Sequence, residues 1–422
     1  MAEARSDNGI DLRVLTAAGI AALVVAVAIA SFLGNPTLVL VTSYAVAWGA
    51  AIVLFGDDTF SRAVNTVIVS YAGLIIFVCT LSPLPNAAIQ GLPLTDRLNY
   101  YYIYYIGSGL SGVEENIEAG YLLLVTVARL LMPFEVFLAL VAVGVLTILL
   151  FLLRALRQER IVGVVALTLI AYFSFWSGAL NITRQFVAAG LGFSAVFVLL
   201  RSGGLSTWLR VTFYLLLVAA SFSVHSSGFI FGLFGLSYAL QKYGDRLLLL
   251  IWGGNISVFI LNILNASPLS IVPGLSDRLA RYDSNQISDA NLAAFQSAGV
   301  TTGNRIDWAL LLLSPMIAYA AAMFLKRKDE AFTEERGGLY LFALLYSVLC
   351  VPFYLLSFLA FGDRIAFYSF LILPAFIIAL ATSAFGKELR YAVLAIFASA
   401  CIAQVGLGIY GYTPKLWLTG LS

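Results

Sequence analysis

Residues 181–200 read NITRQFVAAGLGFSAVFVLL, an apolar run that carries an arginine and a glutamine near its start. With Thr183 as the cap of a helix, Arg184 lies in the first turn. Small residues share the face of Arg184 at helical spacing: Ala188, Gly192 and Ala195. Because small residues let two helices approach closely, we expect Arg184 to point into a helix bundle or a cavity. The alternative is an arginine that snorkels to the membrane interface.

The composition of the whole chain indicates a membrane protein. Of its 422 residues, 61% are hydrophobic and 11% are charged, and the mean hydropathy is +0.96. Water-soluble domains do not sustain such values. The net charge of +2 and the lack of a strongly basic stretch argue against nucleic-acid binding. The three cysteines lie inside apolar runs without metal-ligand spacing, so we expect no metal site.

Apolar runs of transmembrane length recur along the chain and predict an all-α polytopic protein with about 13 transmembrane helices, in a range of about 11–14. The expected spans cover residues 14–33, 37–55, 64–83, 133–153, 161–179, 185–200, 207–224, 226–241, 247–265, 307–325, 338–360, 366–385 and 391–411. We place the break between the seventh and eighth spans at the polar segment SVHSSG, residues 223–228. Residues 1–422 are expected to form a single integral membrane domain.

Lysines and arginines predict the orientation, because cytoplasmic loops carry the excess of these residues. With a cytoplasmic N-terminus, most of the 24 lysines and arginines fall on the cytoplasmic side. The outward exceptions are nearly all arginines: Arg97, Arg129, Arg184, Arg278, Arg281, Arg305, Arg364 and Lys415. Two long outer connections, residues 84–132 and 266–306, are expected to carry short helices. Because a guanidinium suits planar anions, we expect an anion to bind on the outer face.

A second arginine repeats the position of Arg184. In FGDRIAFYSF, residues 361–370, Asp363 can cap a helix that opens with Arg364, and Tyr368 follows one turn on. Outward helix N-termini favour anions through unpaired N–H groups and the helix dipole. Arg184 and Arg364 therefore predict a phosphate site. The alternative is a salt bridge between Asp363 and a neighbouring arginine.

The single histidine, His225, lies in the segment SVHSSG at the outer end of the run 207–224. It is either a hydrogen-bonded packing residue or a functional group, since ionisable residues inside membranes are functional candidates by default. The ordinary pKa of a histidine suits general acid or base chemistry. Glu118 is one of several outward glutamates that could supply a base. The stretch NYYYIYYIG, residues 99–107, is expected to belong mostly to the interfacial aromatic belt.

The outer connection 266–306 contains a short predicted helix that begins at Ser276 or Asp277. It places two arginines and a tyrosine on one edge, with acidic residues beside them: Arg278, Arg281, Tyr282, Asp277 and Asp283. This edge can bind a pyrophosphate and a sugar ring. The alternative is a surface amphipathic helix with compensating charges.

Several of these segments together resemble the EpsG-like branch of the Wzy-type O-antigen and exopolysaccharide polymerases. They are the run 181–200, ASFSVHSSGFIF with its histidine, RLARYDS, DRIAFYSFLILPAF and IEAGYLLL before the fourth span. The resemblance covers roughly residues 95–385 in order. Carried over residue by residue, it implies a site of Arg184, Gln185, His225, Arg278, Tyr282, Arg364 and Glu118, with Arg281, Asp363 and Tyr368 less directly matched.

This resemblance implies a glycosyltransferase that polymerises lipid-linked repeat units on the outer face of the bacterial inner membrane. The implied partners are undecaprenyl-pyrophosphate-linked glycans as donor and acceptor, membrane lipid, a flippase and a chain-length regulator, with no cofactor and no required metal. Arginines at helix N-termini would stabilise the charge that develops on the pyrophosphate leaving group. The acceptor hydroxyl needs a base, for which we consider first His225, then Glu118 or Asp283. Tyr282 would pack on a sugar ring.

Two other functions remain open at this point. A transferase that adds one sugar from a polyprenyl phosphate usually carries acidic residues in its first outer loop, and here that loop is GNP, residues 34–36. A transporter of lipid-linked oligosaccharides would favour inverted repeats and charges near the bilayer midplane, whereas these arginines cluster at outer helix ends. The polymerase is therefore our first hypothesis.

Overall fold

The computed structural model describes residues 36–53, 58–81, 100–101, 103–105, 117–180, 182–201, 204–264, 305–325, 330–356, 366–384 and 387–407. The α-helices are α2 (Pro36–Val53), α3 (Asp58–Leu81), α6 (Ala119–Leu131), α7 (Phe134–Ala155), α8 (Val162–Leu169), α9 (Phe173–Leu180), α10 (Thr183–Leu200), α11 (Thr207–Val224), α12 (Ile230–Ala239), α13 (Asp245–Ile263), α16 (Arg305–Leu325), α17 (Glu330–Leu355), α19 (Phe367–Ala384) and α20 (Lys387–Leu407). Short 3-10 turns are η2 (Glu159–Ile161), η3 (Ser226–Phe229) and η4 (Gln241–Tyr243). No strand occurs within the described ranges, so the all-α prediction is confirmed.

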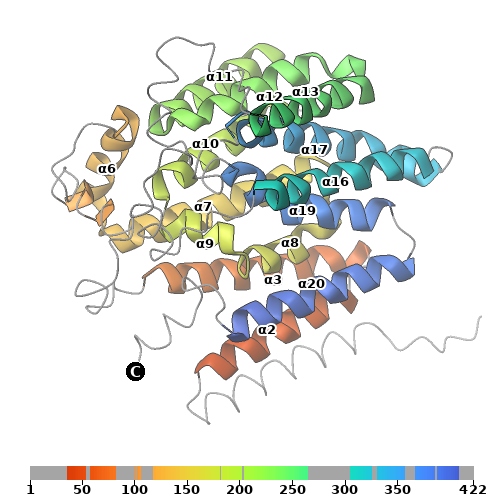
Figure 1. Ribbon diagram of the computed structural model, residues 1–422. Helices are drawn as coiled ribbons and strands as arrows, with labels where there is room; N and C mark the ends of the chain where they lie inside the picture. Colours follow the sequence, from red (N-terminus) through yellow and green to blue (C-terminus); the bar gives the residue numbers. More distant parts are fainter. Residues whose placement is uncertain are drawn as a thin grey trace, which may run out of the picture.

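The helices form a bundle in which most run across the view of Figure 1, with α6 at one end. Six helices of the described part are long and apolar enough to cross a membrane, and six shorter apolar helices accompany them. This arrangement confirms a polytopic membrane protein. The first expected span, 14–33, lies outside the described residues. In the connection 84–132, which is expected to carry a short helix, the structure has the apolar helix α6.

The run 161–179 differs from the single span expected there, because it folds as α8 and α9 with a break at residues 170–172. The indole Nε1 of Trp176 donates to the carbonyl of Ile170 at 2.9 Å, which supplies a partner to a carbonyl that the break leaves without a helical one. All eight residues of α8 are buried. A broken helix is tolerated at membrane depth only where protein encloses it, and here the surrounding helices do so.

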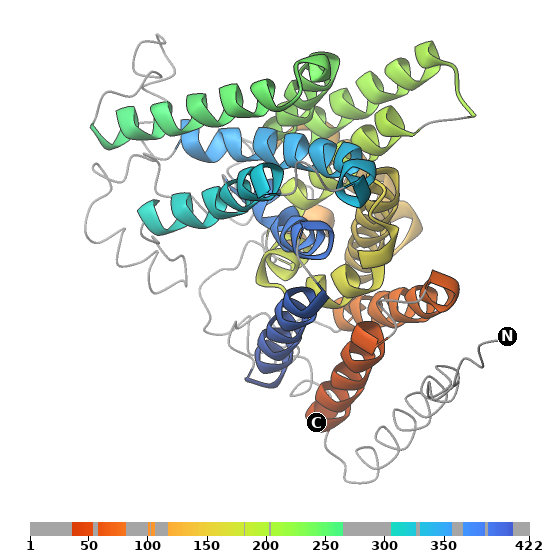
Figure 2. The same cartoon turned by 90° about the vertical axis from the view of Figure 1, so that its right-hand side faces the viewer.

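Helix α19 lies at the centre of the bundle in Figure 2 and contacts α8, α9, α16, α17 and α20. Its residues are almost all buried, and this explains why its sequence is apolar on every face. By contrast, α11 and α13 each expose many large apolar side chains, such as Trp208, Leu216 and Leu250. Such faces suit contact with lipid tails. The described structure thus has a packed centre and an apolar outer surface.

Helix α10 packs against α7, α11 and α12, and its face of small residues meets α11 and α12. A methyl group added at Gly192 would lie 2.5 Å from Cγ of Phe231 in α12, so only glycine fits there. The Ser221 hydroxyl in α11 donates to the carbonyl of Ala188 at 2.8 Å. The prediction of close helix packing along this face is confirmed.

The predicted break at SVHSSG is also confirmed. Helix α11 ends at Val224, His225 has extended backbone, and η3 leads into α12. A methyl group at Gly228 would lie 2.5 Å from the Ser221 hydroxyl oxygen, so the two helices meet closely at this turn. The turn therefore places His225 and its neighbours where α11, α12 and α10 converge.

Candidate functional site

Four segments distant in sequence bring polar groups together beside α6. They are residue 118 just before α6, the first turn of α10, the turn at 225–227 between α11 and α12, and the first turn of α19. We call the cluster of Glu118, Arg184, His225, Ser227 and Tyr368 the polar cluster. Hydrogen bonds join Arg184 to Glu118, His225 to Ser227, and Ser227 to Tyr368. Glu118 connects the first pair to the turn at 225–227 by accepting from the backbone N–H of Ser226.

Arg184 forms an ion pair with Glu118. Its Nη1 lies 2.6 Å from Oε2 of the carboxylate, and the two side chains are 23% and 24% exposed. The guanidinium Nε also donates to the Tyr100 hydroxyl at 3.4 Å, and the guanidinium carbon lies 5.9 Å from the centre of that ring. Because the pair is largely shielded from water, removal of one partner would leave an uncompensated charge. The snorkelling alternative for Arg184 does not fit this geometry.

Thr183 does not cap α10, contrary to the expectation. The cap is Ile182, and Thr183 is the first helical residue. The Ile182 N–H bonds to the Ser177 carbonyl at 2.9 Å, so the short connection from α9 sets the boundary one residue earlier than predicted. Within the described part, the fully buried Thr183 hydroxyl has no hydrogen-bond partner. Arg184 nevertheless occupies the first turn, as expected.

Glu118 joins α10 to the turn that follows α11. Its Oε2 accepts from Arg184, and its Oε1 accepts from the backbone N–H of Ser226 at 3.3 Å. Glu118 also stands at the N-cap position of α6, but its side chain makes no cap bond to that helix. The carboxylate is therefore turned away from its own helix and toward the polar cluster.

His225 is linked to α19 through Ser227. Its Nδ1 lies 2.6 Å from the Ser227 hydroxyl and 3.2 Å from the Ser227 backbone nitrogen. The same hydroxyl lies 2.8 Å from that of Tyr368, which is 1% exposed. The tyrosine ring packs against Phe231 and Phe367. This packing fixes the position of the Tyr368 hydroxyl relative to the histidine.

Glycines allow the segments of the polar cluster to come this close. A methyl group at Gly120 in α6 would lie 2.5 Å from the carbonyl oxygen of Ser223 at the end of α11. One at Gly178 in α9 would lie 2.7 Å from the ring of Phe367 in α19. A larger residue at either position would push its helix away from the site.

The tyrosine-rich stretch is buried to a greater extent than an interfacial belt would be. Tyr100 and Tyr104 are 5% and 0% exposed, whereas Tyr105 is 46% exposed. Tyr100 meets Tyr121 of α6 edge to face, with ring centres 5.8 Å apart. The Tyr104 hydroxyl donates to the Met132 carbonyl at 2.7 Å. The belt interpretation is therefore wrong for Tyr100 and Tyr104. Both side chains contact α6 or the residue that follows it, and Tyr100 also contacts Arg184.

Of the residues predicted for the site, the structure brings together Glu118, Arg184, His225 and Tyr368. Gln185 is buried beside them in α10. The predictions that fall outside the described residues are Arg278, Arg281, Tyr282, Asp283, Asp363 and Arg364. Sequence reasoning missed Tyr100, Ser226 and Ser227. The two serines directly follow the histidine in a polar segment of an apolar chain, and this position could have marked them as site residues.

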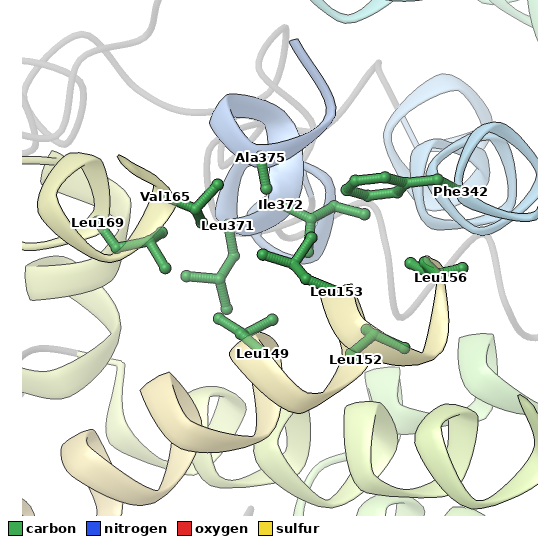
Figure 3. A pocket seen from close by; sticks show the side chains of 10 residues that line it. All are labelled: Leu149, Leu152, Leu153, Leu156, Val165, Leu169, Phe342, Leu371, Ile372 and Ala375. Atoms are coloured by element: carbon green, nitrogen blue, oxygen red, sulfur yellow. The ribbon is translucent and has the colours of Figure 1, made fainter. Parts of the chain in front are cut away.

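Two further features bear on what the site can bind. Among the described residues, no group of three His, Cys, Asp or Glu side chains is placed to hold a metal ion. A small pocket between α7, α8, α17 and α19 is lined only by apolar side chains, as Figure 3 shows. Its lining includes Leu149, Leu169, Phe342 and Leu371. It offers no charge or donor to a sugar or a phosphate, so we do not assign it a substrate.

Fold and site together define a class: a polytopic helical membrane protein with a carboxylate, a guanidinium and an imidazole held in one cluster. A sequence model of the EpsG family matches residues 72–414, most of the chain, and the protein therefore belongs to the EpsG family. This confirms the resemblance seen in the sequence. The protein is accordingly a membrane protein of the polysaccharide polymerase type. No curated protein and no solved structure matches the chain significantly.

Proposed function

We propose that the protein joins undecaprenyl-pyrophosphate-linked oligosaccharide repeat units into a polysaccharide on the outer face of the bacterial inner membrane. The observation that carries this proposal is the Glu118–Arg184 ion pair, linked through the turn at 225–227 to Tyr368. Glycosyl transfer from a pyrophosphate needs a group that removes a proton and a cation that faces the leaving group. The polar cluster offers both within one hydrogen-bonded arrangement.

The reaction breaks the bond between the anomeric carbon of the donor glycan and the pyrophosphate oxygen. A hydroxyl of the acceptor sugar forms the new bond to that carbon and gives its proton to a base in the site. The electron pair leaves with undecaprenyl pyrophosphate, whose added negative charge is stabilised by Arg184. In this scheme, Glu118 orients Arg184 at rest and, with His225 and Asp283, is a candidate for the base. Arg278 and Arg364 extend the proposed pyrophosphate site, and Tyr282 is the proposed contact for a sugar ring.

Location and partners form part of the same proposal. Lysine and arginine are in excess in the connections that would lie on one side of the membrane, which supports a cytoplasmic N-terminus. With that orientation, α6 and the polar cluster would lie on the outer face. Lipid-linked repeat units reach that face through a flippase, and a chain-length regulator sets how many are joined. Because charge on the leaving group is stabilised by arginine, the scheme requires neither metal nor cofactor.

Reconstitution tests the proposal directly. Purified protein in liposomes would be incubated with lipid-linked repeat units, with and without a chelator, and the products separated by length. We expect a ladder of polymer lengths in both conditions. A product longer by a single sugar would favour the single-sugar transferase instead.

Deletion with complementation provides the cellular counterpart. Loss of the gene should leave surface molecules capped with one repeat unit, and wild-type protein should restore the ladder. If no repeat unit reaches the outer surface after deletion, a transporter is the better interpretation. Protein with Arg129→Ala is a matched control, because Arg129 is an exposed outward arginine in α6 outside the polar cluster.

A further inference from the structure

The contacts of His225 determine which of its ring nitrogens carries a proton. Nδ1 lies 3.2 Å from the backbone nitrogen of Ser227, in a geometry in which the histidine side chain accepts the hydrogen bond. A backbone N–H can only donate. Nδ1 must therefore present its lone pair, and a neutral imidazole then carries its proton on Nε2. An imidazolium would place an N–H against another N–H.

The same constraint sets the direction of the other two hydrogen bonds. Because Nδ1 has no proton, the Ser227 hydroxyl at 2.6 Å must donate to it. With its proton used in this way, the Ser227 oxygen can only accept from the Tyr368 hydroxyl at 2.8 Å. A chain of donors thus runs from Tyr368 through Ser227 to His225, and the buried tyrosine ring holds its far end in place.

We propose that Ser227 and Tyr368 are positioning residues that keep His225 neutral, with Nδ1 as acceptor and Nε2–H as donor. The catalytic consequence rests on the proposed function. His225 acts as a hydrogen-bond donor to an oxygen of the lipid-linked substrate and retains its proton throughout. The proton of the acceptor hydroxyl goes to the carboxylate of Glu118, the bond to the anomeric carbon forms, and the pyrophosphate leaves with the electron pair. His225 is thereby excluded as the general base.

The chain contains one histidine, so nuclear magnetic resonance can read its tautomer without assignment. The full-length protein, purified with a histidine-free tag and labelled with 15N-histidine, should show an unprotonated Nδ1 and a protonated Nε2. Ser227→Ala and Tyr368→Phe leave the longer backbone N–H contact of Ser227 as the main constraint on Nδ1, so each should weaken the tautomer preference and shift the Nδ1 signal part of the way toward that of a mixture of tautomers. Matched controls are Ser399→Ala, whose hydroxyl bonds only within its own helix, and Tyr243→Phe, which is 53% exposed. A protonated Nδ1 in the wild-type protein would overturn the proposal.

Chain growth by the reconstituted protein tests the role of the histidine. Glutamine places an amide N–H near the position of Nε2, whereas asparagine places one near Nδ1. We expect His225→Gln to retain most of the rate and His225→Asn to lose it, while Glu118→Gln slows growth by roughly 10²–10⁴-fold, as expected for loss of a general base. If His225→Gln is as slow as Glu118→Gln, His225 is not merely a donor and the proposal fails. If the wild-type protein makes no polymer, the proposed function fails, and the nuclear magnetic resonance result still decides the tautomer.

Discussion

The carboxylate of Glu118 and the guanidinium of Arg184 lie 2.6 Å apart although 66 positions separate them in the sequence. One belongs to the segment before α6 and the other to the first turn of α10, so their contact fixes a peripheral helix to the bundle. Arg184 also donates to the Tyr100 hydroxyl, and Glu118 also accepts from the Ser226 N–H. Their ion pair is consequently both a structural link and the charged centre of the proposed site.

Energetic coupling within this pair can be measured by a double-mutant cycle. Glu118→Ala and Arg184→Ala should each destabilise the protein by about 1–3 kcal/mol, because each leaves a partly buried charge without its partner. The double variant should be less destabilised than the sum of the two, with a coupling of about 0.5–3 kcal/mol. Unfolding in detergent, followed by circular dichroism, would give the three values. Strict additivity would show that the ion pair contributes no net stability.

Arg184→Lys tests whether the shape of the guanidinium matters beyond its charge. Lysine keeps the charge but cannot reach Glu118, Tyr100 and a pyrophosphate with one planar group. We expect chain growth to fall by about 10²–10³-fold, the usual effect of removing one donor to a developing oxyanion. The rate would be measured on reconstituted protein, beside Arg129→Lys as control. Wild-type ladders from Arg184→Lys would refute the assignment of this arginine to the leaving group.

Gly192→Ala should reduce stability because the new methyl group would overlap the Phe231 ring. Overpacking of this kind typically costs about 1–3 kcal/mol. Gly144→Ala in α7 is the matched control, since nothing lies within 4 Å of a methyl group there. Replacing a glycine inside a helix without a clash should stabilise by about 0.5–1 kcal/mol. Opposite shifts of the melting temperature in the two variants are expected, and equal shifts would contradict the close approach of α10 and α12.

Gly120→Ala should impair function more than stability. The methyl group would meet the backbone of Ser223, and α6 must move away from α11 to accommodate it. Glu118 moves with α6, and a displacement of about 1 Å at a catalytic group can cost 10²-fold in rate. The overlap itself should cost about 1–3 kcal/mol of stability. Chain growth, measured well below the melting temperature, should fall by more than the fraction of unfolded protein explains. Gly73→Ala, inside α3 at a position with no atom within 4 Å, should leave chain growth unchanged and, like Gly144→Ala, stabilise the protein by about 0.5–1 kcal/mol.

Much of the fold follows from the length and composition of the apolar runs, but the break in the run 161–179 does not. Hydropathy averages over a window, and the segment around Ile170 is as apolar as its neighbours. At the break, the Trp176 indole donates to the Ile170 carbonyl six positions earlier, a single local hydrogen bond that an averaged hydropathy does not register. The break at His225 was predictable because polar residues interrupt the apolar pattern there.

The candidate site was predictable one residue at a time, but the pairing of its members was not. Arg184 and His225 stand out as ionisable groups beside apolar runs, and Tyr368 follows an arginine at a helix start. Glu118 is one of several glutamates in its connection, and only the position of α6 selects it as the partner of Arg184. Tyr100 was misassigned to the belt because a tyrosine near a membrane edge has the same sequence context whether it faces lipid or protein.

The interruption between α8 and α9 also constrains how the chain is assembled during synthesis. Neither eight-residue helix is long enough to cross a bilayer, and the peptide groups between them find their hydrogen-bond partners inside the protein, as in the bond from the Trp176 indole to the Ile170 carbonyl. One of the helices that enclose them is α19, which the ribosome delivers only near the end of the chain. Residues 162–180 therefore gain their final enclosure only after α19 has been made, and a late segment completes a layer that began in the first half of the protein.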